Sequence, residues 1–287
     1  MGRGNDRERK QQVEDTDSFY NIRLQLGRQN FRKVEKATLA FIGVGGINSN
    51  LVLALAGTGF RHFLLIDGDR VSRRNIALSN IFTQRDINSH KANVAEAFLR
   101  SKYGSRIEIE THSTYSDKVP FEMITEPDML FLGVDDRWSR LAITNLRAEA
   151  NKPYVNLGFY GWEASYMLVL PRKTACWACL WRPRDDERVL RLKREGKCPE
   201  PEPNVPGAVI PATVQRLIGF TAGETVKFFT GIGKLTQYYK FNTLTGHEEL
   251  RFLDSPDFFK PDPTCPICHE EEEIDVSQIK WPKDRSN

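Results

Sequence analysis

The stretch Thr38-Leu-Ala-Phe-Ile-Gly-Val-Gly-Gly-Ile-Asn48 decides the fold of this chain. Its apolar first half ends directly in glycines, and helix-like apolar spacing follows over residues 47–55. That order predicts a strand, a tight turn and a helix. Gly43, Gly45 and Gly46 let the backbone turn sharply and leave amide groups at the helix start, where the helix dipole favours negative charge. The turn is therefore a candidate phosphate site.

A second apolar run, residues 62–66, ends in Asp67-Gly-Asp69. Acids at the end of the second strand are placed to accept hydrogen bonds from ribose hydroxyls, so the two motifs together predict a nucleotide site. A glycine turn alone would not predict a nucleotide site, because any tight strand-to-helix turn uses glycine. The spacing Gly-x-Gly-Gly, with Asn48 at the place of the third expected glycine, argues against a plain NAD site.

The rest of the first half alternates between apolar strand candidates and helical patterns. Alternation of this kind predicts an α/β fold with a doubly wound, mainly parallel, Rossmann-like sheet that helices cover on both faces. The further strand candidates are residues 107–111, 129–133 and 154–157, and the helical stretches between them are 91–102 and 139–151.

The second half continues the same unit with a different pattern. It has strand candidates at 165–170, 237–242 and 248–253, helices at 185–194 and 213–229, and a proline-rich loop at 199–206. We divide the chain into a flexible leader (1–18), a nucleotide-binding part (19–160), a C-terminal part that binds zinc (161–269) and a polar tail (270–287).

Charge and hydropathy exclude two classes of partner. The formal net charge of +3 over 287 residues is too small for a nucleic-acid-binding protein, which shows a clustered basic face. No apolar run is long enough to cross a bilayer, and residues 1–17 do not look like a signal peptide. We expect a soluble, cytoplasmic protein.

Four of the five cysteines form two Cys-x-x-Cys pairs, Cys176/Cys179 and Cys265/Cys268. Two such pairs make the closed tetrahedral site that structural Zn²⁺ prefers. Because protein would fill all four positions, no site remains for an activated water, and the metal would be structural. Cys198 is left over.

Read in order, these motifs resemble the superfamily of ubiquitin-activating-like (ThiF-type) adenylating enzymes. The resemblance runs from about Arg23 to Cys268. Its relatives include activators of sulfur-carrier proteins, the activator of ubiquitin-fold modifier and the enzyme that adenylates a microcin precursor peptide. The motifs are Gly43-Val-Gly45-Gly46, Asp67-Gly-Asp69, Asn75, Lys91, Gly133-Val-Asp135 and the cysteine pairs.

The resemblance implies adenylation of a peptide or protein carboxylate by ATP and Mg²⁺. In that scheme the glycine turn, Asn75 and Lys91 hold phosphates, Asp69 holds the ribose and Asp135 serves the Mg²⁺-assisted reaction centre. Arg23 would act across a dimer interface, so the resemblance implies a homodimer, with residues 213–229 and the Arg23 region as interface candidates.

Leu78 departs from the family pattern, because relatives carry an arginine three residues after the asparagine. Arg73, Arg74 or Arg85 could replace its charge. Two other classes stay open. A nicotinamide-dependent oxidoreductase would share the glycine turn and Asp67 but would not need the paired cysteines, and a non-catalytic scaffold would fit Asn48 and Leu78.

Cys198 decides between two substrates. A reactive cysteine needs an electropositive neighbourhood, which Arg191, Lys193, Arg194 and Lys197 could provide. If Cys198 forms a thioester, the substrate is a ubiquitin-like or sulfur-carrier protein. If it does not, the substrate is a ribosomally made precursor peptide with an internal nucleophile. The proline-rich segment after Cys198 argues against the thioester.

Overall fold

A computed structural model describes residues 18–135, 137–181, 209–265 and 267–268. The helix expected at 185–194, the proline-rich loop, Cys198, the polar tail and nearly all of the leader lie outside these residues. The described α-helices and β-strands, in chain order, are α2 (Tyr20–Leu26), α3 (Arg28–Lys36), β1 (Thr38–Ile42), α4 (Asn48–Gly57), β2 (His62–Ile66), α5 (Arg73–Ile76), α6 (Lys91–Tyr103), β3 (Glu108–His112), α7 (Phe121–Thr125), β4 (Met129–Leu132), α8 (Arg137–Glu149), β5 (Tyr154–Tyr160), β6 (Glu163–Val169), α9 (Trp177–Trp181), α11 (Pro211–Thr230), β7 (Thr236–Asn242) and β8 (Glu248–Phe252).

One eight-stranded sheet runs through both halves of the chain, in the order β3-β2-β1-β4-β5-β6-β7-β8. Every neighbouring pair from β3 to β5 is parallel, and the pairs from β5 to β8 are antiparallel. The predicted α/β fold with a mostly parallel sheet is confirmed. The strand order reverses between β1 and β4, and in doubly wound sheets ligands bind beyond the carboxyl ends of the strands at such a point.

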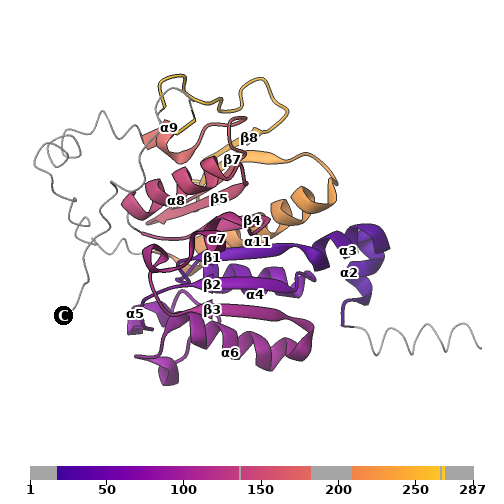
Figure 1. Cartoon of the computed structure of the whole chain (residues 1–287), viewed down its shortest axis with the longest axis vertical. Coiled ribbons are helices and arrows are strands. Elements are labelled where there is room, and N and C mark those ends of the chain that lie inside the picture. Colours follow the sequence, from indigo (N-terminus) through magenta and orange to yellow (C-terminus); the bar gives the residue numbers. More distant parts are fainter. Residues whose placement is uncertain (1–17, 136, 182–208, 266, 269–287) are drawn as a thin grey trace, which may run out of the picture.

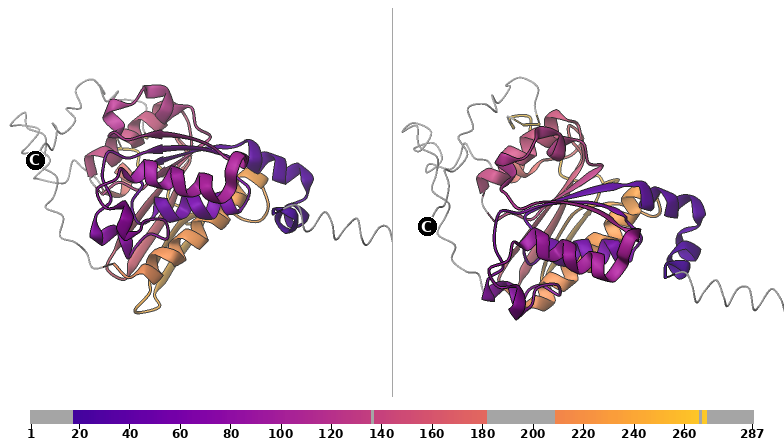
Figure 2. Two further views of the ribbon diagram at one scale, coloured as in Figure 1. Left: turned by 90° about the horizontal axis from the view of Figure 1, so that it is seen from below. Right: turned by 60° about the horizontal axis from the view of Figure 1, so that its bottom comes forward.

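Helices cover both faces of the sheet (Figures 1 and 2). Leu39 and Phe41 of β1 pack into one core with residues of α4, α6 and α11. Ala40 and Ile42, which alternate with them, pack into a second core with residues of α7 and α8. Side chains of a strand point alternately to the two faces, so β1 is apolar throughout because both of its faces are buried.

Two N-terminal helices, α2 and α3, were not predicted. Phe31 and Val34 anchor α3 in the protein, and Phe19 is buried just before α2. Gly59 accommodates this packing, because a Cβ at that position would lie 2.7 Å from the Phe31 ring. Figure 1 shows α2 and α3 at one end of the sheet and α5 at the other.

A buried arginine ties α8 to the loops around it. Arg147 is fully buried, and its guanidinium donates hydrogen bonds to the carbonyl oxygens of Ile124 and Pro127, each at 3.0 Å, and of Pro153. Burial lowers the pKa of Arg147 to about 9.

Within the described part of the chain, none of the helices combines the length and the apolar character needed to cross a membrane.

Candidate functional site

The glycine turn between β1 and α4 is shaped by close backbone approaches on one side and open space on the other. Gly43 has a φ of +79°, and a Cβ there would lie 2.9 Å from the carbonyl oxygen of Gly133. A Cβ at Gly46 would lie 3.0 Å from Cβ of Leu78, whereas a Cβ at Gly45 would meet no atom within 4 Å. Gly43 and Gly46 are therefore explained by packing within the chain, and Gly45 is not.

The Asn48 side chain stabilises the glycine turn from its buried side. Its side chain is fully buried, and Nδ2 donates to the carbonyl oxygens of Gly43 at 2.9 Å, Phe131 at 3.2 Å and Ile42 at 3.3 Å. Its Oδ1 is buried without a hydrogen-bond partner among the described residues. Asn48 thus joins the ends of β1 and β4 and does not fill the open space at Gly45.

Asp67 contacts the glycine turn from β2. Its Oδ2 accepts the Val44 backbone N–H at 2.6 Å, and its Oδ1 accepts that of Asp69 at 2.7 Å. Burial raises the pKa of Asp67, while the Lys91 ammonium and the two backbone N–H groups act in the opposite direction. The sequence predicted a ribose contact here, and the structure adds that this carboxyl fixes the backbone of the turn.

Asp69 and Lys91 form an ion pair beside the turn. Lys91 Nζ lies 2.9 Å from Asp69 Oδ2, and the Lys91 backbone N–H donates to the Asp69 carbonyl at 3.1 Å. The lysine side chain is 10% exposed and the aspartate side chain 54% exposed. The Tyr115 hydroxyl donates to the other Asp69 oxygen at 3.1 Å. Tyr115 was not identified from the sequence, because only the strand order shows that the segment after β3 lies beside the end of β2.

Asn75 and Leu78 line the segment after β2. Asn75 Oδ1 accepts hydrogen bonds from the Ser72 backbone at 2.8 Å and the Ser72 hydroxyl at 2.9 Å, which fixes the start of α5. Leu78 is half-buried against Gly46. The arginines proposed to replace the charge expected at Leu78, namely Arg73, Arg74 and Arg85, are all exposed.

Asp135 is exposed and follows β4 directly before α8. Because Ile42 aligns with both Ile66 and Leu132, the segments after β1, β2 and β4 leave the same edge of the sheet.

On the first turn of α8, Arg140 donates to Asn156 Oδ1 at 2.5 Å and to the Leu157 carbonyl at 2.9 Å, which fixes α8 to β5. Sequence reasoning did not identify Arg140.

Arg23 does not join these residues within one chain. It lies on α2, with its guanidinium 5.3 Å from the centre of the Phe31 ring. The two N-terminal helices precede β1, so they lie near the strand's amino end, whereas the glycine turn follows its carboxyl end (Figure 1).

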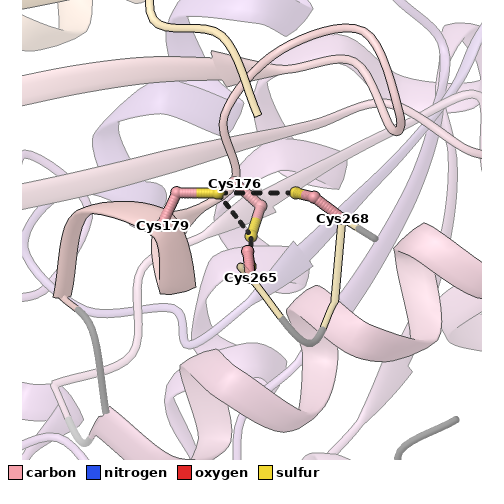
Figure 3. A group of neighbouring side chains, drawn as sticks. All are labelled: Cys176, Cys179, Cys265 and Cys268. Atoms are coloured by element: carbon pink, nitrogen blue, oxygen red, sulfur yellow. Dashed lines mark hydrogen bonds between the residues drawn. The ribbon is translucent and has the colours of Figure 1, made fainter. Parts of the chain in front are cut away.

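The four paired cysteines meet in one cluster (Figure 3). Sγ of Cys176 lies 3.8 Å from that of Cys179 and 3.7 Å from that of Cys265, and Sγ of Cys179 lies 3.6 Å from that of Cys268. Four thiolates at about 2.3 Å from a tetrahedral Zn²⁺ would be about 3.8 Å apart. The cluster therefore has the spacing of a zinc site, as predicted.

The zinc-type cluster is supported by the residues around it. The backbone N–H of Asp262 donates to Cys179 Sγ at 3.4 Å, and that of Ala175 donates to the Phe259 carbonyl at 2.8 Å. Beneath it, the buried Tyr154 hydroxyl accepts the Trp177 backbone N–H at 3.4 Å. The first two bonds join the segment after β8 to the segment after β6, and the third joins α9 to β5.

Comparisons with known proteins agree on one family. The model of the ThiF family matches residues 20–267. Ubiquitin-like modifier-activating enzyme 5 of Branchiostoma floridae is 26% identical over 261 residues, which are 82% of this chain and 58% of that protein. SUMO-activating enzyme subunit uba-2 of Caenorhabditis elegans is 27% identical over 158 residues, 54% of this chain and 27% of that protein. The chain thus spans less than two thirds of the length of both relatives.

Solved structures share the fold. The crystal structure of Escherichia coli MccB with ATP has a TM-score of 0.67 at 18% identity, and the match covers 88% of this chain and 75% of that one. The crystal structure of PaaA has a TM-score of 0.66 at 16% identity and covers 85% and 83% of the two chains.

Proposed function

Because this chain belongs to the ThiF family, we propose that it activates the carboxylate of a peptide or protein with ATP. A carboxylate oxygen attacks the α-phosphorus of ATP, the new O–P bond forms, the bond between the α-phosphorus and its bridging oxygen breaks, and pyrophosphate leaves. The products are an acyl adenylate and pyrophosphate. The single observation that carries the proposal is that the glycine turn, the Asp69–Lys91 pair and Asp135 lie at the ends of three neighbouring strands.

The proposed roles follow from charge and position. The reaction brings two anionic groups together, so catalysis consists largely of neutralisation and in-line positioning. Phosphates would lie over the open side of Gly45, against the amides at the start of α4. The largely buried Lys91 ammonium would neutralise phosphate oxygens, Asn75 would contact the phosphates, and Asp69 would contact the ribose.

Asp135 fits a magnesium ligand, because it is an exposed hard-oxygen donor beside the proposed phosphate position. Mg²⁺, when bound, supplies further charge neutralisation at the phosphates. The four-cysteine cluster fits Zn²⁺ and would serve a structural purpose, since its four ligands complete a tetrahedral shell.

The substrate class is proposed from the relatives. They include an enzyme that activates a ubiquitin-like modifier, and the structure of MccB with MccA shares the fold. We propose a homodimer, because Arg23 lies far from its own glycine turn and would need a second copy to reach a reaction centre. Cys198, outside the described residues, remains the candidate for a thioester with a ubiquitin-like or sulfur-carrier protein.

Exchange between ATP and labelled pyrophosphate tests the proposal. The full chain is incubated with candidate peptides and ubiquitin-like proteins, and exchange that depends on the carboxylate is expected. Lys91→Met should abolish it, whereas Lys102→Met, on the exposed face of the same helix, should not.

Two results would contradict the proposal. Absence of exchange together with no thermal shift from ATP would favour a non-catalytic scaffold, because a bound nucleotide stabilises the folded state by mass action. A nicotinamide cofactor that co-purifies with the protein would favour the oxidoreductase.

A further inference from the structure

Tyr115 is an aromatic residue that the proposed chemistry does not use. It follows β3 and is 45% exposed. One side of its ring packs on Gly68, because a Cβ at Gly68 would lie 2.9 Å from three atoms of the ring. Its hydroxyl donates to Asp69 Oδ1 at 3.1 Å, while Lys91 Nζ lies 2.9 Å from Asp69 Oδ2.

The position of Tyr115 follows from the strand register. Ile42, Ile66 and His112 align across β1, β2 and β3, so the segments that follow these strands start from one level. Neighbouring strands lie about 4.8 Å apart, so the ends of β1 and β3 are separated by about 10 Å. A nucleotide with phosphates at the glycine turn and its ribose at Asp69 therefore extends its base over the end of β3.

We propose that Tyr115 is a nucleotide-contacting residue that determines affinity for the base of ATP. Its ring packs on the face of the purine, and its hydroxyl holds Asp69 in the orientation that receives the ribose. Aromatic rings stack well on bases because both have flat π-faces. This inference rests on the proposed ATP site.

Dissociation constants for ATP test it directly. They are measured by calorimetry on the full chain as wild type, Tyr115→Ala, Tyr115→Phe and the control Tyr160→Ala. Tyr160 is 70% exposed and lies at the end of β5, so its loss should leave ATP binding unchanged. Loss of a stacking ring weakens binding by between about 5- and 150-fold. We expect that loss in Tyr115→Ala, most of the affinity retained in Tyr115→Phe, and one melting temperature for all nucleotide-free proteins.

Gly68→Ala supplies a second, independent perturbation. Its new methyl group would collide with the Tyr115 ring and displace it, whereas in the Tyr115→Ala background the methyl group meets no ring. Gly68→Ala should therefore weaken ATP binding in the wild type and have no further effect in the double variant.

The outcomes separate the two proposals. If the wild type binds ATP and Tyr115→Ala binds it equally well, the role of Tyr115 is wrong and the ATP site stands. Additive effects of Gly68→Ala and Tyr115→Ala would also overturn it. If the wild type does not bind ATP, the proposed function fails and the role of Tyr115 fails with it.

Discussion

Alanine at Gly43 should destabilise the fold and alanine at Gly45 should weaken ATP binding, although the two glycines belong to one turn. At Gly43 the residue would need a φ of +79° and a Cβ 2.9 Å from the backbone oxygen of Gly133. The left-handed conformation costs an L-residue about 1–2 kcal/mol, and overpacking costs about 1–3 kcal/mol. Gly43→Ala should therefore lower the free energy of unfolding by about 2–5 kcal/mol.

At Gly45 the same methyl group meets nothing within 4 Å, and φ is not in the left-handed region. The free energy of unfolding should then change by less than about 0.5 kcal/mol. The new Cβ would, however, stand where the phosphates are proposed to approach the backbone, because glycine allows that close approach. Affinity for ATP should fall by about tenfold or more.

Urea denaturation followed by tryptophan fluorescence measures the first quantity, and calorimetric titration with ATP measures the second. A Gly45→Ala protein that binds ATP as the wild type does would refute the phosphate position. A Gly43→Ala protein that loses less than about 1 kcal/mol would refute the packing argument for the turn.

Three further predictions concern other parts of the chain. Arg147→Met leaves two buried carbonyl oxygens and one partly buried carbonyl oxygen without their donor and should lower the free energy of unfolding by about 3 kcal/mol, measured with urea. Cys265→Ser should remove bound zinc, measured by elemental analysis, and should lower the melting temperature. Cys198→Ala should keep the metal. If Cys198 forms a thioester, Cys198→Ala should also lose a reducible adduct. Burial raises the pKa of Tyr154 and Tyr166 well above 10. Above about pH 10 these tyrosines lose their protons in the unfolded chain but keep them in the folded protein. The free energy of unfolding should therefore fall as pH rises, by up to about 1.4 kcal/mol per pH unit for each residue. Tyr166→Phe should reduce that slope, measured by urea denaturation at several pH values.

The sequence predicted those parts of the site in which local order determines geometry. Gly43 and Asp67 each follow a strand directly, and Asp135 follows β4 after two residues, so a parallel sheet brings them to one edge whatever the details of packing. The cysteine pairs were equally readable, because two thiols three residues apart already lie on one side of a short turn or helix.

Features that depend on distant contacts were not predicted. The α3 helix is nine residues long and buries only Phe31 and Val34, and two apolar positions are too few to identify a helix from the sequence. The special place of Tyr115 depends on β3 being the neighbour of β2, and no local pattern contains that information. One missed signal was available. The two residues between β5 and β6, Gly161-Trp162, are too few for a parallel connection and indicate an antiparallel pair.

The amide of Asn48 has a mechanical consequence. It bonds to carbonyls of both central strands at the point where the strand order turns back. These hydrogen bonds hold β1 and β4 together, so the two strands should not move apart to accommodate a larger ligand. Any adjustment to what is bound must come from side chains that stand above them, such as Lys91 and Tyr115, so we expect substrate-induced movement in those groups while the sheet stays still.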